Sequence, residues 1–297
     1  MDLKNYLEEK RAIVNEALKE IFPPSTAPSR DIVKAMNYSL FAGGKRLRPI
    51  LCMAGAEAVG GNGRSVLPVA CALELIHTYS LIHDDLPVMD DDDMRRGKPT
   101  SHKVFGEALA VLAGDGLLTE AFRIMTLTDT HQGQVNAQSL LRVVALIAEA
   151  AGYQGMVGGQ VVDIQSEGKD VDLPLVEFIH IHKTGALITA SVSSGAILGG
   201  GEETQISAIK EYGQKIGLAF QISDDILDIE GDSAEMGKSI GGDVEKKKIT
   251  FPSVIGIDRS KTIQQEMVDQ ALEALKPFDH RAEPLRQIAA YIIERKK

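Results

Sequence analysis

The chain has 297 residues, enough to bury a large core in one sizeable domain or in two ordinary ones. Apolar residues make up 44% of it and charged residues 25%, proportions that are ordinary for a folded protein and argue against disorder. The formal net charge of -10 argues against a general binder of nucleic acids or anionic membranes, because the average field repels phosphate-rich polymers. Any anionic ligand therefore needs locally grouped basic side chains.

The cysteine content and the amino-terminal segment bear on the compartment. Cys52 and Cys71 are too few for a disulfide framework or a zinc site, so a reducing cytoplasm fits best. Residues 1–20 mix charged side chains with Leu and Ile, so we expect no secretory signal there. We also expect no stretch long and apolar enough to cross a bilayer.

The apolar residues of the chain follow a helical period. From Leu3 to Ile21 they recur at three- and four-residue steps, which predicts a helix with one buried face that ends at Pro23 and Pro24. The same period predicts helical segments at 32–40, 49–59, 65–85, 103–127, 136–166, 173–199, 204–230 and 250–296. Strand patterns are almost absent, and no repeat or change in composition marks a boundary. We predict one all-α domain of about ten helices over residues 1–297.

A first acidic cluster follows the segment 65–85. Six aspartates stand between positions 84 and 93: Asp84, Asp85, Asp90, Asp91, Asp92 and Asp93. At about 5 Å each pair of like charges costs about 1 to 3 kcal/mol, so the cluster needs either bound cations or full exposure in a solvated loop. Asp84 and Asp90 would point about 120° apart on a straight helix, and Pro87 disfavours its continuation. We therefore expect the helix to end or bulge between Asp85 and Asp90, so that both carboxylates face one pocket.

A second acidic cluster changes the balance between those two interpretations. Asp224 and Asp228 are four residues apart on a predicted helix, so their carboxylates share one face, and Asp225 is three residues from Asp228. The surrounding residues are apolar, and carboxylates near a core need compensation. Oxygen ligands without Cys or paired His favour Mg²⁺ over Zn²⁺. Magnesium held in this way keeps positions open for phosphate oxygens of a substrate.

Three basic groups could bind such phosphates. They are the stretch 43–49 with Lys45 and Arg48, the pair Arg95 and Arg96, and Lys183-Thr184 with the distant Lys238. Each group by itself is typical of solvated surface charge, and the indication comes from their combination. The loop 231–248, rich in Gly, Ser, Asp and Lys, is longer than a helix connection requires and is a candidate lid.

These motifs resemble the trans-isoprenyl diphosphate synthases, especially the bacterial farnesyl diphosphate synthase type. Asp84-Asp85-Leu86-Pro87-Val88-Met89-Asp90, followed by Arg95-Arg96-Gly97, resembles the first aspartate-rich motif of that family, and Asp224-Asp225-Ile226-Leu227-Asp228 resembles the second. The 44–49 stretch, His77, Lys183-Thr184, Phe220-Gln221 and Gly237-Lys238 stand in the expected order. The resemblance covers nearly the whole chain and implies a bundle of helices around a central cavity.

The resemblance also implies a role for each site residue. Mg²⁺, three ions per site with substrate bound, would be held by residues among Asp84, Asp85, Asp90, Asp224, Asp225 and Asp228. The allylic diphosphate would contact Arg95, Lys183 and Lys238, and isopentenyl diphosphate would contact Lys45, Arg48, His77 and Arg96. Lys183, Thr184 and Gln221 would act in catalysis by stabilising the allylic carbocation. Taken alone, His77 is typical of a core histidine on an apolar helix.

Tyr79 is the candidate for the residue that sets product length. It precedes Asp84 by five positions, which could place its ring across the floor of a tunnel for the prenyl chain. In similar enzymes a bulky residue here goes with fifteen-carbon products, so we expect farnesyl diphosphate made from isopentenyl diphosphate and dimethylallyl or geranyl diphosphate. The alternatives are a geranylgeranyl diphosphate synthase, a terpene cyclase, and a non-catalytic partner subunit of a synthase.

The remaining expectations concern assembly and the carboxyl terminus. The resemblance implies a homodimer, while the sequence does not indicate which helix would face the second copy. The basic end, 295–297, is typical of a frayed tail, although relatives place such a terminus over the site, where one of its cations would approach isopentenyl diphosphate. We expect a cytoplasmic enzyme without stable membrane insertion.

Overall fold

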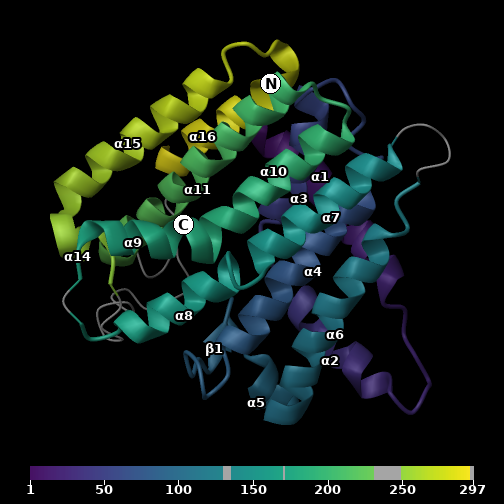
Figure 1. Cartoon of the computed structure of the whole chain (residues 1–297). Helices are drawn as coiled ribbons and strands as arrows, with labels where there is room; N and C mark the ends of the chain where they lie inside the picture. The colour runs from purple at the N-terminus through teal and green to yellow at the C-terminus, as the bar shows by residue number, and fades with distance from the viewer. Residues whose placement is uncertain (130–134, 170, 231–248, 295–297) are drawn as a thin grey trace.

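The computed structural model describes residues 1–129, 135–169, 171–230 and 249–294, and helices dominate these ranges (Figure 1). In chain order the elements are α1 (Leu3–Ile21), α2 (Arg30–Leu40), α3 (Leu47–Ala58), α4 (Leu67–Asp84), β1 (Met94–Arg95), β2 (Lys98–Pro99), α5 (Ser101–Phe105), α6 (Glu107–Met125), α7 (Ala137–Ala151), α8 (Met156–Ser166), α9 (Leu173–Ile179), the π-helical turn η1 (His180–Gly185), α10 (Ala186–Leu198), α11 (Glu203–Glu230), α14 (Phe251–Ile255), α15 (Ile257–Ala274), the 3₁₀ turn η2 (His280–Ala282) and α16 (Glu283–Glu294). The two short strands pair antiparallel. The all-α class is confirmed, while the single domain stays a prediction.

Glycines lie at the breaks within two of the predicted helical segments. Gly106, with φ 83°, ends α5 and precedes α6 within the predicted segment 103–127. The segment 136–166 breaks between α7 and α8, where a Cβ on Gly155 would lie 2.1 Å from the carbonyl oxygen of Ala150. Breaks within the predicted segments were expected, but the helical period did not give their positions.

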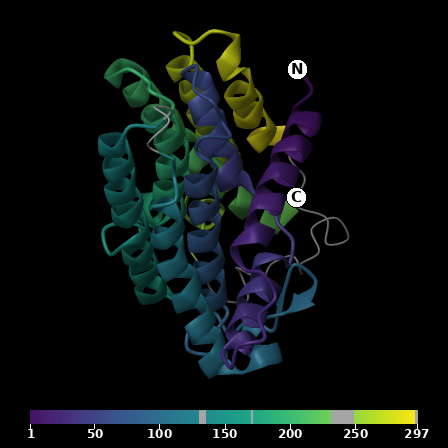
Figure 2. The ribbon, with the colours of Figure 1, turned by 90° about the vertical axis from the view of Figure 1, so that its right-hand side faces the viewer.

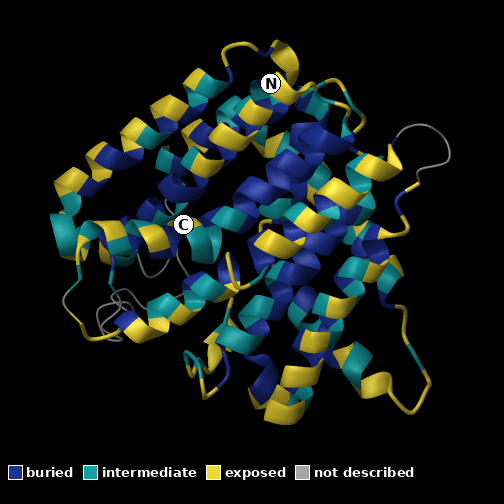
Figure 3. Cartoon of the chain, viewed as in Figure 1, coloured by how far each residue is buried: buried dark blue, intermediate teal, exposed yellow. Residues whose placement is uncertain are grey.

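Helices α3, α4 and α10 form the centre of the molecule. Helix α4 lies along α6, α3 lies along α10, and α10 also packs on α11, which in turn contacts α15. Every residue from Leu187 to Leu198 is buried, and Figure 3 shows α10 in the dark blue of buried residues behind a more exposed outer layer. Figure 2 shows several of the long helices running side by side.

A smaller apolar cluster lies beside the second acidic motif. It consists of six buried side chains: Val176, Leu218, Ile222, Ile226, Phe251 and Ile263. These residues join α9, α14 and α15 to the carboxyl-terminal half of α11. Burial of this face fixes the rotation of α11 about its axis and thereby decides which of the aspartates at 224–228 point outward.

One sequence expectation about membranes was wrong. Within the described residues, the stretch Ala137–Ser166 is long and apolar enough to cross a bilayer, judged by length and composition only. In an apolar part of 18 residues within this stretch, 33% is buried. This stretch comprises α7 and α8 with the break between them. Its exposed apolar side chains include Leu141, which is 69% exposed, and Val161, which is 48% exposed.

Candidate active site

A cavity of about 660 Å³ opens between the loop before α3, the middle of α4, strand β1, α10 and α11. Among the residues that line it are six predicted from the sequence: Lys45, Arg48, His77, Arg95, Arg96 and Asp224. The positions of these residues span nearly 180 residues of sequence, and the helix bundle brings them to one place. The cavity thus joins the predicted phosphate-binding residues to the second acidic motif.

The first acidic motif turns back on itself where α4 ends. The helix ends at Asp84, and the amide N–H of Asp90 donates to the carbonyl oxygen of Asp84 at 2.8 Å. The N–H of Asp91 likewise donates to the carbonyl of Leu86 at 3.1 Å. These bonds bring the backbone of Asp90 beside that of Asp84 although the two residues are six positions apart, which confirms the predicted end of the helix. Both aspartates are partly exposed, as ligands of a substrate-bridging cation must be.

The side chain of Asp85 is buried, unlike those of Asp84 and Asp90, which are partly exposed. It is 3% exposed, and its Oδ1 accepts hydrogen bonds from Nε and Nη2 of Arg95 at 2.7 and 2.6 Å. Burial raises the pKa of Asp85 above its ordinary value, and the guanidinium of Arg95 works in the opposite direction. The pair fixes the orientation of Arg95 at the wall of the cavity. The assignment of Asp85 as a magnesium ligand stays a prediction.

The three aspartates of the second motif also differ in environment. Asp224 lines the cavity, whereas Asp225, about 100° further round α11, is 5% exposed and faces inward. Oδ2 of Asp225 lies 2.8 Å from Nε2 of His180 and accepts the amide N–H of Phe251 at 2.8 Å. Asp228 is partly exposed one turn beyond Asp224. Asp225 thus holds α11 against η1 and α14, and its role as a metal ligand stays a prediction.

The loop that carries Lys45 and leads to Arg48 at the start of α3 depends on glycine. Gly43 and Gly44 have φ of 112° and 127°, a region that side-chain-bearing residues rarely adopt. A Cβ on Gly44 would lie 2.7 Å from Nη1 of Arg96, and the same guanidinium donates a hydrogen bond to the carbonyl of Gly43. The glycines therefore let the loop approach Arg96 closely, which gathers three cationic side chains at one mouth of the cavity.

Arg46, between the two predicted ligands, also lines the cavity, but its guanidinium is already paired within the protein. Its φ is 54°, it is 4% exposed, and its guanidinium forms an ion pair with Glu74 of α4 at 2.7 Å. Further hydrogen bonds run to Asn15 at 2.9 Å and to the carbonyl of Leu40 at 2.7 Å. The sequence did not reveal this role, because nothing in a run of basic residues tells which one turns inward. Glu74 within an otherwise apolar helix was the available signal.

The electrostatics of the cavity suit an anion. Burial lowers the pKa of Arg48 to about 10, and its Nε is buried without a hydrogen-bond partner. Burial, followed by the neighbouring arginines, lowers the pKa of His77 well below its ordinary value, so the imidazole is neutral at pH 7. A neutral ring among cations can donate a hydrogen bond to a diphosphate oxygen without a charge of its own. The unpaired guanidinium nitrogen fits the same ligand.

Lys183, Thr184 and Gln221 do not line this cavity. Lys183 and Thr184 lie in η1, and Nζ of Lys183 is 2.5 Å from Oδ2 of Asp163 on α8. Gln221 is partly exposed on α11, next to Phe220, which does line the cavity. The catalytic roles of these three residues stay predictions. Lys238, the candidate lid 231–248 and the basic end 295–297 fall outside the described residues.

The chemistry of the acidic side chains fits magnesium. Asp224, which lines the cavity, and the partly exposed Asp84, Asp90 and Asp228 offer carboxylate oxygens, and partial exposure leaves room for water and phosphate ligands. Asp84 and Asp224 also act on the arginines of the cavity, since Asp84 favours the charged form of Arg95 and Asp224 that of Arg48. The two acidic motifs thus act on arginines that line the same cavity.

Comparisons with known proteins agree with this geometry. The family model described as polyprenyl synthetase matches residues 29–291. A geranylgeranyl diphosphate synthase of Cyanophora paradoxa is 48% identical over 295 residues, which cover 99% of this chain and 97% of that protein. The crystal structure of a geranylgeranyl pyrophosphate synthetase from Pyrococcus horikoshii superposes with a TM-score of 0.90 and is 32% identical, over 99% of this chain and 98% of that one. The apo crystal structure of an FPP/GFPP synthase from Zymomonas mobilis superposes with a TM-score of 0.86 and is 38% identical, over 98% of each chain. The chain belongs to the polyprenyl synthetase family.

Proposed function

We propose that this prenyltransferase joins isopentenyl diphosphate to an allylic diphosphate, dimethylallyl or geranyl diphosphate, in a magnesium-dependent reaction. The observation that carries the proposal is the cavity in which Lys45, Arg48 and His77 face Asp224. Two separate polar walls suit two diphosphates, one held by cationic side chains and one bridged by cations to carboxylates. Mg²⁺ at the aspartates, three ions in our proposal, would stabilise the negative charge that grows on the departing diphosphate.

The residues of the chain would divide the remaining work. Lys45, Arg48, His77 and Arg96 would bind the diphosphate of isopentenyl diphosphate and orient its double bond. Arg95, fixed by Asp85, would contact the allylic diphosphate, and oxygens of Thr184 and Gln221 would face the carbocation. The apolar walls would exclude water from it. No protein nucleophile is required, because the double bond of the second substrate attacks the carbocation.

The first test concerns Asp224. We expect Asp224→Asn to lower kcat by about 10²–10³-fold, the usual loss when a group that stabilises transition-state charge is removed, with little change in the free energy of unfolding. The matched control is Asp269→Asn on α15, which should leave kcat unchanged. Steady-state assays with geranyl and isopentenyl diphosphates, with and without EDTA, measure both variants. Full activity in Asp224→Asn, or turnover that EDTA does not abolish, would contradict the proposal. Turnover by the wild-type chain alone also excludes the partner-subunit alternative.

For the product, we propose geranylgeranyl diphosphate, the length that the names of the Cyanophora and Pyrococcus relatives favour over our sequence-based expectation. Farnesyl diphosphate is the second candidate, and Tyr79 is the observation that favours it. The ring of Tyr79 is 7% exposed and meets the ring of His83 edge-on at 5.7 Å, so it is a bulky, fixed group one and a half turns before Asp84.

Replacing Tyr79 separates these candidates. If the ring ends the tunnel, Tyr79→Met opens it, and we expect the main product to lengthen by one five-carbon unit in chromatography of the dephosphorylated products. Tyr153→Met, at a position that is 80% exposed, is the control and should leave the products unchanged. Wild-type enzyme that already makes the twenty-carbon product would rule out farnesyl diphosphate. An unchanged product distribution in Tyr79→Met would show that this ring is not the gate.

We further propose a cytoplasmic homodimer. Apolar side chains are exposed on consecutive outer helices, with Leu112 of α6 56% exposed and Leu141 of α7 69% exposed. Exposed side chains of this kind on neighbouring helices are typical of surfaces that meet another protein surface. Membership of the family supports a second copy of the chain as the partner.

A further inference from the structure

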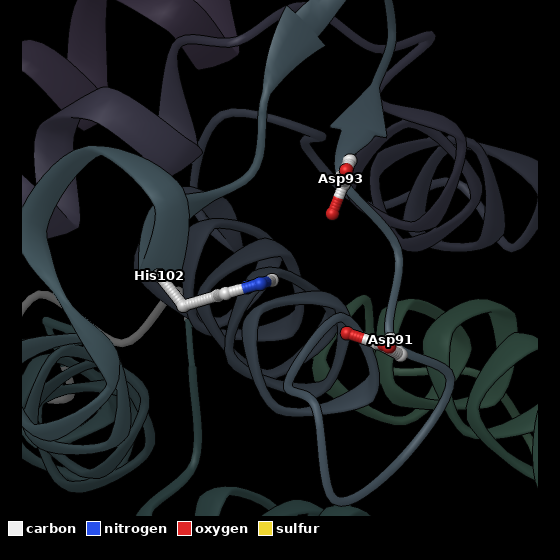
Figure 4. A group of neighbouring side chains, drawn as sticks. All are labelled: Asp91, Asp93 and His102. Carbon is white, nitrogen blue, oxygen red and sulfur yellow. The ribbon is translucent and has the colours of Figure 1, made fainter.

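We propose that Asp91, Asp93 and His102 form a second site for a divalent cation, apart from the one that serves the diphosphates. One ligand atom from each of these residues lies within 4.8 Å of the other two. Figure 4 shows the imidazole of His102, at the start of α5, directed toward the two carboxylates on the segment opposite. Nothing in the proposed reaction uses these three residues, and none of them lines the large cavity.

His102 supplies the observation that points to a ligand. The residue is 7% exposed, and its Nε2 is buried without a hydrogen-bond partner. Most buried side-chain nitrogens have a hydrogen-bond partner, because an unmet one loses its contacts with water without compensation. The ring is directed toward the two carboxylates in Figure 4, and a cation held between them would satisfy the unpaired nitrogen.

The hydrogen bonds of Thr100 decide which nitrogen of His102 carries the proton. The hydroxyl of Thr100 donates its hydrogen to the carbonyl oxygen of Asp92 at 2.8 Å. The hydroxyl oxygen of Thr100 lies 3.2 Å from Nδ1 of His102, and because its one hydrogen is already donated to Asp92 it can only accept a hydrogen bond from that nitrogen. When the ring carries a single hydrogen, this arrangement favours that hydrogen on Nδ1 and the lone pair on Nε2. A hydrogen bond that fixes one ring nitrogen in this way is the usual accompaniment of a metal-ligating histidine.

The two carboxylates are presented by the turn after Asp90. Asp91 has φ 50°, the left-handed conformation, which sets it apart from the extended chain around it. Asp93 forms an ion pair with Nζ of Lys103 at 2.6 Å through Oδ1. A carboxylate offers two oxygens and about four lone-pair sites, so one ammonium group does not saturate Asp93. Lys103 would instead compete with the cation for the negative charge of the Asp93 carboxylate.

The donor set indicates the class of cation. Two carboxylates with one imidazole suit a first-row transition ion such as Mn²⁺, Co²⁺ or Zn²⁺, whereas the carboxylates at the large cavity suit Mg²⁺. The bound ion would tie the segment 91–93 to the start of α5. It would thereby steady the turn between Asp90 and Arg95, both of which have proposed roles at the diphosphates.

Nitrogen coordination provides the test, because the ligands proposed at the catalytic site are all oxygens. We would add Mn²⁺ to the full-length chain without diphosphate and record electron spin echo modulation, together with calorimetric titrations. The ¹⁴N modulation of a bound imidazole is expected in the wild type and in Asp224→Asn, and it should vanish in His102→Gln. Asp91→Asn and Asp93→Asn, at exposed positions, should weaken the binding of Mn²⁺ by at least about tenfold.

Two further variants sharpen the test. Thr100→Val keeps the shape of the side chain and removes the hydroxyl, so it should weaken binding by about 10–100-fold. Lys103→Met removes the competing ammonium group and should tighten it. Absence of ¹⁴N modulation in the wild type, or its persistence in His102→Gln, would overturn the proposal. If His102→Gln does not fold, unchanged affinity in both Asp91→Asn and Asp93→Asn would overturn it equally.

Discussion

Two basic residues near the start of α3 line the same cavity but differ in their partners. The guanidinium of Arg46 is paired with Glu74, whereas Nε of Arg48 is buried without a hydrogen-bond partner. Removing one member of a buried ion pair leaves an uncompensated charge, which typically costs about 3–5 kcal/mol. Arg46 and Glu74 therefore position the loop, and the loop positions the residues proposed to bind phosphate. In the same way, the buried Asp85 and Asp225 hold in place the backbone that carries the more exposed Asp84 and Asp224.

The lowered pKa of His77 makes stability depend on pH. In the unfolded chain a histidine takes up a proton near pH 6.5, whereas in the folded chain His77 remains neutral to lower pH. Protons therefore favour the unfolded state, so the contribution of His77 is fully present above pH 6.5 and falls as the pH drops below it. The loss is at most about 1.4 kcal/mol per pH unit.

Urea unfolding at pH 5.5 and 7.5 measures this effect. We expect His77→Gln to lose less stability between the two pH values than the wild type does. His280→Gln, a replacement at an exposed position, is the control and should behave as the wild type. An identical pH dependence in His77→Gln and the wild type would show that His77 does not resist protonation.

At the scale of elements, the crossing of α3 and α10 depends on glycines. A Cβ on Gly195 would lie 1.8 Å from the carbonyl oxygen of Cys52, and one on Gly55 would lie 2.2 Å from that of Val192. Both obstacles are backbone atoms of the facing helix, so no side chain can move aside. The glycines are therefore retained inside helices, where Ala would otherwise be favoured by about 1 kcal/mol.

Gly195→Ala should separate α3 from α10. We expect the free energy of unfolding to fall by about 1–3 kcal/mol or more, because overpacking outweighs the gain in helix propensity. Gly116→Ala is the control, since there a Cβ would lie 3.0 Å from the flexible Sδ of Met36, which can shift. Urea unfolding of both variants measures the difference, and equal stabilities would contradict the close crossing.

The π-helical turn η1 is a second element with local consequences. It interrupts the helical run from α9 to α10 and carries His180, Lys183 and Thr184. Single π-helical turns inside helices are rare and often occur at functional sites. Here the turn directs His180 to Asp225 of α11 and Lys183 to Asp163 of α8, so it links three helices through two polar contacts.

At the scale of the whole molecule, the proposed homodimer is open to a direct test. Leu112→Glu and Leu141→Glu place charges on the exposed apolar helices, so we expect each to shift the mass in solution from twice the 32.0 kDa chain mass toward that of one chain. Val104→Glu on α5, 46% exposed, is the control. Size-exclusion chromatography with light scattering gives the masses. A wild-type monomer, or unchanged masses in both variants, would contradict the proposal.

The sequence by itself determined the class of fold and the chemistry of the motifs. Helical periodicity marks each buried face, and Asp, Arg and Lys have few uses in such groups other than binding cations and phosphates. It also predicted the end of α4, because a six-residue spacing with Pro87 cannot keep Asp84 and Asp90 together on a straight helix.

Only the tertiary structure decided which member of each group faces the cavity. The side chains of Arg46, Asp85 and Asp225 are held by partners that lie 10 to 45 positions away in the sequence, which no local pattern can indicate. The breaks at Gly106 and Gly155 and the group of His102 with Asp91 and Asp93 were likewise decided by how the chain packs. Local propensity sets the helices, but the direction of each polar side chain follows from the packing of helices that are distant in sequence.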